Sequence, residues 1–251
     1  MVSLRIVTNV HLSPLTNKRA DLSFSCTWPH EPHLPRTHYS ASQRQQTDTS
    51  LNSSYTPECA IFRKAVSELI GPDLLDVFDL LHSISSQPLA EDASETERRD
   101  ISTTVYSAER VLLEHQSRIQ SVAGQPSWGR IFSYAAMTYI TVALRDFPLE
   151  APRLVQVVRW LDGELTSLIR KRPVDEMGQA ELVLTLWMRM VQLIATPKER
   201  LSPHLVPSLS SISKALGIDS VASLASTLRQ VVWSDGLSTC CVGRLFSESA
   251  S

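Results

Sequence analysis

Apolar residues recur every three or four positions along most of the chain after residue 56, which is the period of an amphipathic helix. Prolines and glycines separate these stretches, and no segment alternates apolar and polar residues for long enough to indicate a strand. Helices are predicted over residues 57–70, 72–85, 94–123, 127–145, 152–172, 175–195, 202–216 and 220–233, with a last turn over 242–247. The expected fold class is all-α, a single helical domain of about eight helices with a disordered N-terminal tail.

Several predicted helix ends carry capping residues. Ser94 followed by Glu97 is a capping box, in which the serine oxygen accepts from the Glu97 amide and the glutamate reaches back. Asp175 and Ser220 are the predicted N-caps of two later helices. Gly217 follows a helix end, at the position where a left-handed residue is usual.

Residues 1–56 differ from the rest of the chain. Three prolines lie close together at positions 29, 32 and 35, and the polar run from Ser40 to Ser54 shows no helical period. We predict a disordered tail over residues 1–56 and a helical domain over residues 57–248. The alternative is that the tail is an artefact of where the start of the gene was assigned. No signal peptide is expected, because no charged segment precedes an apolar core.

Composition limits the classes of partner. The 251 residues include 24 Lys and Arg and 26 Asp and Glu, which gives a formal net charge of -2. This balance lacks the basic footprint of nucleic-acid binding and gives no case for a membrane surface. Ile131–Leu144 is the longest uncharged helical stretch and is shorter than the about 20 residues that span a bilayer, so we interpret it as a core helix. The cysteines form no CxxC pair, which favours an intracellular setting with reduced thiols; they are Cys26, Cys59, Cys240 and Cys241.

Two clusters raise the question of metal chemistry. The first combines cysteine and histidine in the proline-broken tail, with a spacing that fits no closed zinc site; it comprises Cys26, His30, His33 and His38. The second repeats aspartate every three residues, at Asp73, Asp76 and Asp79, as diphosphate–magnesium chemistry would need. These aspartates interleave with apolar residues, which favours the solvated face of a helix.

The remaining candidates are isolated in sequence. General base catalysis needs an oriented partner, which the sequence does not supply for His82, His115 or His204. The tryptophans on four helices favour core packing over an aromatic ligand pocket; they are Trp128, Trp160, Trp187 and Trp233. The basic run 170–172 fits the cation preference of a last helical turn. We therefore assign no catalytic, cofactor-binding, DNA-binding or metal-binding residue and expect no cofactor.

The C-terminal half resembles the fungal-specific transcription factor domain, the helical regulatory region of zinc binuclear cluster transcription factors. The resemblance covers roughly residues 94–248 and lies in short motifs in the family's order. They are Tyr134–Ile140, Leu144–Pro148, Leu182–Trp187, Ala195, Lys198–Arg200, Leu216–Ile218, Leu224, Leu228, Val232–Asp235 and Leu245–Glu248. The chain departs from the family in lacking the six-cysteine zinc cluster and in having a shorter helical region.

The resemblance implies a transcription-regulator-like helical domain that acts through a protein or a small ligand. It implies a nuclear location, with the cytoplasm as the alternative, and a protein partner or self-association. Because the cluster that holds the DNA contacts is missing, direct DNA binding by this chain alone is not expected, and neither is membrane association. We expect no enzymatic activity; the alternative is an all-helical enzyme or a small-molecule-binding protein of secondary metabolism.

Overall fold

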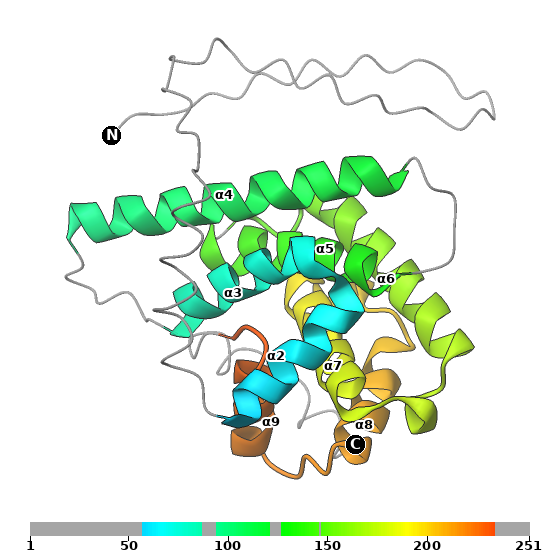
Figure 1. The fold of residues 1–251 in the computed structure, drawn as a ribbon. Helices are drawn as coiled ribbons and strands as arrows, with labels where there is room; N and C mark the ends of the chain where they lie inside the picture. The colour runs from blue at the N-terminus through cyan, green and yellow to red at the C-terminus, as the bar shows by residue number, and fades with distance from the viewer. Residues whose placement is uncertain (1–56, 87–93, 121–126, 146, 234–251) are drawn as a thin grey trace, which may run out of the picture. The chain divides into compact units, whose positions relative to one another are not determined.

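The computed structural model describes residues 57–86, 94–120, 127–145 and 147–233 (Figure 1). Within these ranges it contains eight α-helices and no strand, which confirms the predicted all-α class. The α-helices are α2 (Pro57–Ile70), α3 (Pro72–Ser86), α4 (Glu95–Gln120), α5 (Trp128–Tyr139), α6 (Pro152–Lys171), α7 (Gln179–Ala195), α8 (Leu205–Ala215) and α9 (Val221–Arg229). Short turns of helix complete the set: η1 (Ile140–Leu144), η2 (Val174–Glu176) and η3 (Lys198–Arg200). The predicted tail over 1–56 and the predicted turn over 242–247 lie outside the described residues.

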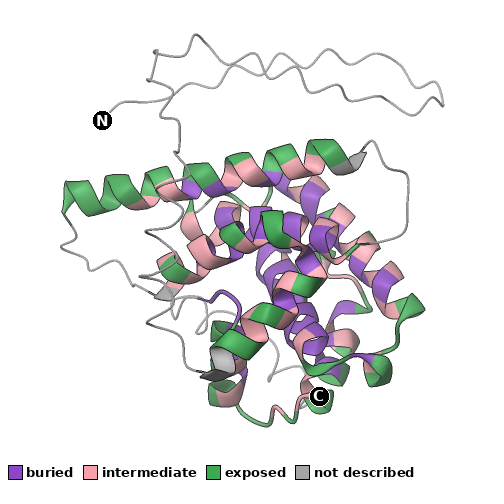
Figure 2. Ribbon diagram, viewed as in Figure 1, coloured by how far each residue is buried: buried purple, intermediate pink, exposed green. Residues whose placement is uncertain are grey.

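Helix α7 forms the centre of the core. Every residue from Glu181 to Ala195 is buried, and the ribbon of this helix in Figure 2 is coloured mostly as buried. Helices α2, α5, α6, α8 and α9 pack against it. Helix α5, which the sequence predicted to be central, also lies inside, in contact with α2, α4, α6 and α7. Burial on all sides explains why the α7 sequence shows so little polar surface.

Helix α4 covers α3 and α5 with one apolar stripe, which includes Val105, Ala108 and Leu112. Its opposite side is exposed, as Figure 2 shows. The predicted capping box starts this helix: the Ser94 amide donates to Glu97 Oε2 at 2.7 Å, and the Glu97 amide donates to Ser94 Oγ at 3.2 Å. Hydrogen bonds from the Ser94 side chain and backbone hold the pKa of the Glu97 carboxyl below its usual value.

Two predicted helix starts are wrong by a few residues. Helix α7 begins after Gly178, whose amide donates to Glu181 Oε2 at 2.8 Å, while Asp175 lies in the short turn η2. Helix α8 begins at Leu205 instead of Ser202, because residues 202–205 form a turn in which the Leu205 amide donates to the Ser202 carbonyl. The predicted cap Ser220 is confirmed, with its oxygen accepting from the Ser223 amide.

Gly217 ends α8 in the way the sequence predicted. Its φ of 65° is left-handed, and the amides of Gly217 and Ile218 donate to the carbonyls of Lys214 and Ser213. This paired pattern is the Schellman motif, which satisfies two carbonyls that the helix end would leave unpaired. A glycine adopts this φ without the steric cost that a Cβ would bring.

The helix predicted over 127–145 changes its winding before it ends. From Ile140 to Leu144 it is a π-helix, and the Arg145 amide donates to the Ile140 carbonyl at 3.0 Å. Val142, in this turn, packs against both the main core and a small second cluster formed by Leu154, Val158 and Ala195. The π turn thus connects the core to the part of the molecule that holds the candidate site.

Candidate functional site

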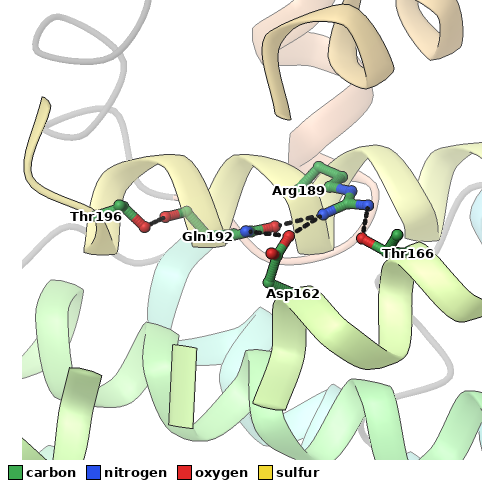
Figure 3. A network of polar contacts seen from close by, with 5 residues as sticks. All are labelled: Asp162, Thr166, Arg189, Gln192 and Thr196. Atoms are coloured by element: carbon green, nitrogen blue, oxygen red, sulfur yellow. Dashed lines mark hydrogen bonds and ion pairs between the residues drawn. The ribbon is translucent and has the colours of Figure 1, made fainter. Parts of the chain in front are cut away.

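A buried arginine organises the polar contact between α6 and α7. Arg189 is only 2% exposed. One terminal nitrogen of its guanidinium donates to Asp162 Oδ1 at 2.9 Å and to Gln192 Oε1 at 2.7 Å, and the other donates to Thr166 Oγ1 at 3.2 Å (Figure 3). Asp162 and Thr166 are four residues apart on α6, and Arg189 and Gln192 are three apart on α7. These spacings place each pair on one helix face, so the two faces meet.

The ion pair compensates the burial of the guanidinium. Desolvation lowers the pKa of Arg189 from its ordinary value, and the hydrogen bond and charge of Asp162 raise it again. An arginine remains protonated at any physiological pH, so the pair carries one positive and one negative charge. The Arg189 Nε atom is buried and makes no hydrogen bond within the described part of the chain. The network is therefore held chiefly by Asp162.

Gln192 extends the network toward the end of α7. Its side-chain nitrogen donates to Asp162 Oδ1 at 2.8 Å, so that this oxygen accepts from two donors. Its backbone carbonyl accepts from the Thr196 hydroxyl at 2.7 Å. Figure 3 shows the chain of contacts running from Thr166 through Arg189 and Gln192 to Thr196, with the second oxygen of Asp162 outside it. Among the described residues, Asp162 Oδ2 has no hydrogen-bond partner, and the Asp162 side chain is 33% exposed.

A cavity of about 240 Å³ adjoins this network, between α6, the end of α7 and the residues around η3. One part of its wall is apolar: Val155, Val158, Ala195 and Pro197. A second part is polar and uncharged: Gln192, Thr196 and Ser202. The charged residues of the wall are Arg159, Asp162 and Arg200. A concave apolar wall with a few convergent polar groups is the usual form of a small-molecule site.

The cavity carries an excess of positive charge. Arg159 and Arg200 are exposed, and neither forms an ion pair with a carboxylate of the described ranges. The charge of Asp162 is already matched by Arg189. Lys198 and Glu199, in the same turn as Arg200, have opposite charges and do not line the cavity. The cavity mouth thus presents two cationic groups to solvent.

The three aspartates of α3 do not form a shared site. Asp79 forms a two-point ion pair with Arg63 of α2, with Arg63 Nε donating to Asp79 Oδ1 at 2.9 Å. Asp73 faces Arg118 of α4 at 3.7 Å, and Asp76 is exposed. Across the described ranges, no group of three or more His, Cys, Asp or Glu side chains is placed to hold a metal ion. The arrangement fits a solvated helix face that also ties α3 to its neighbours.

Two of the three described histidines make hydrogen-bond contacts with other parts of the chain. His115 of α4 lies 2.9 Å from Ser133 Oγ of α5, and burial lowers the pKa of its imidazole. Ser133 in turn donates to the Gly129 carbonyl. His82 Nδ1 lies 2.7 Å from the Val231 carbonyl, and His204 is exposed at the start of α8. None of these three histidines lines the cavity.

The tryptophans do not gather around a ligand site. Trp187 and Trp233 are buried in the core, whereas Trp128 and Trp160 are half-buried, and none of the four lines the cavity. Trp187 contacts the rings of Phe132 and Tyr139. The other sequence candidates lie outside the described residues; they are Cys26, His30, His33, His38, Cys240 and Cys241.

Two members of the basic run 170–172, Arg170 and Lys171, lie in the last turn of α6, as predicted. The third, Arg172, is the C-cap residue of α6 and forms an ion pair with Glu181. This ion pair connects the end of α6 to the start of α7, and the sequence did not predict it.

Sequence reasoning missed the network itself, although one signal was present. Arg189 is the only charged residue between Leu182 and Ala195, in a segment otherwise apolar enough to be core. A charge in such a segment is almost always paired when it is buried. That rule predicts an acidic partner on a neighbouring helix, and Asp162 is that partner.

The chain was compared with protein-family models, curated proteins and solved structures, and none of them matches it. In the described part of the chain, every helix is too short or too polar to cross a membrane.

Proposed function

We propose that this chain is a non-catalytic, transcription-regulator-like helical domain that acts through interaction with a small ligand or a protein. The single observation that carries the binding part of the proposal is the wall of the α6–α7 cavity. It combines apolar side chains with anchored polar groups, and its charged groups are Arg159, Asp162 and Arg200. Such a wall can hold and orient a ligand.

The same wall favours binding over catalysis. No histidine, cysteine or lysine lines the cavity. The Thr196 hydroxyl donates to the carbonyl one turn earlier, and Asp162 Oδ1 is engaged by Arg189 and Gln192. A nucleophilic mechanism would need a hydroxyl within hydrogen-bond reach of a base that a third group orients. The hydrogen bonds of the described wall residues contain no such series.

The regulatory part rests on the resemblance of the helical segments to the fungal transcription factor domain. Two of its motif segments, 182–187 and 232–235, are far apart in sequence, and the Trp187 indole donates to the Val232 carbonyl at 2.6 Å. The cavity lies at the C-terminal end of the same helix, α7. Under the proposal, a ligand bound at Gln192 and Thr196 acts through α7 on the residues that follow α9.

A tethering experiment tests the regulatory role. The full chain is fused to a heterologous DNA-binding module and expressed in fungal cells with a reporter gene behind the module's site. We expect reporter transcription to change several-fold relative to the module alone. The same fusion carrying Trp187→Ala, which removes the core contact to Val232, should lose the effect. A full-length fusion that accumulates in the nucleus and leaves transcription at the level of the module alone would contradict the proposal.

A further inference from the structure

We infer that the α6–α7 cavity binds a small zwitterion with an apolar body, the chemical class of an aliphatic α-amino acid. The inference rests on the ligand-binding part of the proposed function and names the ligand class for that site. Three features of the cavity wall carry it: two cations at the mouth, an acceptor group beside them, and an apolar surface of limited size.

The cations fit the carboxylate of the ligand. Arg159 and Arg200 both line the cavity, and neither has a carboxylate partner in the part of the chain that is described. A guanidinium binds a carboxylate through two parallel N–H···O bonds, which gives direction as well as attraction. Arg159 comes from α6 and Arg200 from η3, so the carboxylate would lie between the two walls.

The acceptor groups fit an ammonium. Asp162 Oδ1 is occupied by Arg189 and Gln192, whereas Oδ2 is free within the described residues and belongs to a side chain that lines the cavity. The C-terminal end of α7 also lines it, at Ala195 and the C-cap residue Thr196. A helix C-terminus carries a partial negative charge, which stabilises a cation close to it. A plain anion would gain nothing from either group.

The spacing of the charges suits adjacent amino and carboxylate groups. Arg159 and Asp162 are three residues apart on α6, so their Cβ atoms are neighbours on one helix face, about 5–6 Å apart. An α-amino acid bears its two charged groups on neighbouring carbon atoms. One molecule of this kind can therefore contact both side chains at once.

The volume of the cavity limits the size of the apolar part of the ligand. A volume of about 240 Å³ lies below the about 300–1,000 Å³ of pockets that hold drug-sized ligands, so this cavity suits a smaller molecule. Two residues of the apolar wall, Val158 and Ala195, belong to the small second hydrophobic cluster. A branched aliphatic side chain would cover this wall, whereas a drug-sized ligand would exceed the volume.

Calorimetric titration of the full chain with three matched probes tests the inference. L-leucine carries both charges, 4-methylpentanoate lacks the amino group, and 3-methylbutylamine lacks the carboxylate. We expect saturable binding of L-leucine and at least tenfold weaker binding of the other two. Equal binding of 4-methylpentanoate would overturn the role of Asp162 Oδ2, and absence of L-leucine binding would overturn the inference.

Two variants locate the binding site. Arg159→Gln and Arg200→Gln should each raise the Kd for L-leucine about tenfold, since each removes one charge-assisted contact. Arg153→Gln is the matched control, because Arg153 is an exposed arginine of the same helix that does not line the cavity. Melting curves of all three should match the parent chain. An equal loss in all three variants would show that the binding is non-specific attraction to a basic surface.

A negative result in the titration can be distinguished from a negative result in the tethering experiment. If the chain binds L-leucine but leaves reporter transcription unchanged, the result supports the binding site and contradicts the regulatory role. If the chain changes reporter transcription but binds none of the three probes, the result supports the regulatory role and contradicts the proposed ligand class.

Discussion

The indole N–H of Trp187 donates a hydrogen bond to the backbone carbonyl of Val232 at 2.6 Å, and both residues are buried. This contact links the centre of α7 to the segment that follows α9, 45 positions further along the chain. A buried carbonyl needs a partner, because leaving it unpaired costs about 1–3 kcal/mol. The tryptophan thus contributes packing area and a specific polar contact to the core.

Replacing Trp187 with phenylalanine should lower the free energy of unfolding by about 3 kcal/mol. The change leaves the Val232 carbonyl without its donor and opens a space beside Phe132 and Tyr139. Urea unfolding of the full chain, followed by circular dichroism, measures the loss. Trp160→Phe is the control, since Trp160 is half-buried against Tyr134, and it should cost about 1 kcal/mol. Similar losses in both variants would argue against the hydrogen bond.

Removing Asp162 should destabilise the protein more than removing its partner Arg189. Asp162→Ala leaves a buried guanidinium uncompensated and should cost about 3 kcal/mol of stability. Arg189→Met leaves a carboxylate that is one-third exposed and can be hydrated, so it should cost less. The double variant should be more stable than Asp162→Ala alone. A double variant in which the two single losses simply add would show that the pair is not coupled.

Replacing Gly129 and Gly163, the two glycines inside the described helices, with alanine should change stability in opposite directions. A Cβ on Gly129 would lie 2.9 Å from the backbone oxygen of Ile70, where α5 meets α2, so Gly129→Ala should destabilise the protein by about 1–3 kcal/mol. A Cβ on Gly163 meets nothing within 4 Å. Gly163→Ala should therefore stabilise α6 by about 1 kcal/mol through helix propensity. Thermal melting compares the two, and stabilisation by Gly129→Ala would show that α2 and α5 can separate freely.

His115 should make stability depend on pH below neutrality. Burial lowers its pKa in the fold, the nearby Asp73 raises it and Arg118 lowers it, and the net result is below the ordinary 6.5. In the window between the folded value and 6.5, the unfolded chain binds more protons than the folded one. The contribution of His115 is therefore complete above pH 6.5 and is lost as the pH falls toward the folded value.

His115→Asn isolates this effect, because the amide keeps a polar contact to Ser133 and does not titrate. Between pH 7.5 and pH 5, the unfolding free energy of the parent chain should fall more steeply than that of the variant. The other six histidines are the same in both proteins. Parallel curves for the two proteins would mean that the imidazole of His115 is as easily protonated in the fold as outside it.

The sequence predicted the helices because their signals are local. Gly217, Ser220 and the Ser94–Glu97 pair act within one or two helical turns, and each was confirmed where it was expected. The predicted cap at Asp175 is wrong because a competing local partner, Glu181, satisfies the Gly178 amide and starts the helix three residues later. Where several possible capping residues lie close together, such contacts decide at which residue the helix begins.

The candidate site could not be located from the sequence, because its parts come from separate segments. Arg159 and Asp162 lie on α6, Gln192 lies on α7 with Thr196 at its C-cap, and Arg200 lies on η3. No sequence spacing relates residues that only helix packing brings together. The unusual charge of Arg189 predicts a buried partner but does not predict which acid supplies it.

The π turn at Ile140–Leu144 has a consequence for how the length of this chain can vary. A π turn contains one residue more than an α turn, as a single insertion into an ordinary helix would produce. Because the wide turn takes up the extra residue, deleting one residue there would restore regular winding while Arg145 kept its place against Glu109, which it meets at 2.7 Å. The deletion would change only the turn itself, where Val142 packs against the cluster of Leu154, Val158 and Ala195. A length change of one residue at this point would therefore alter the packing beside the cavity and leave the rest of the fold in register.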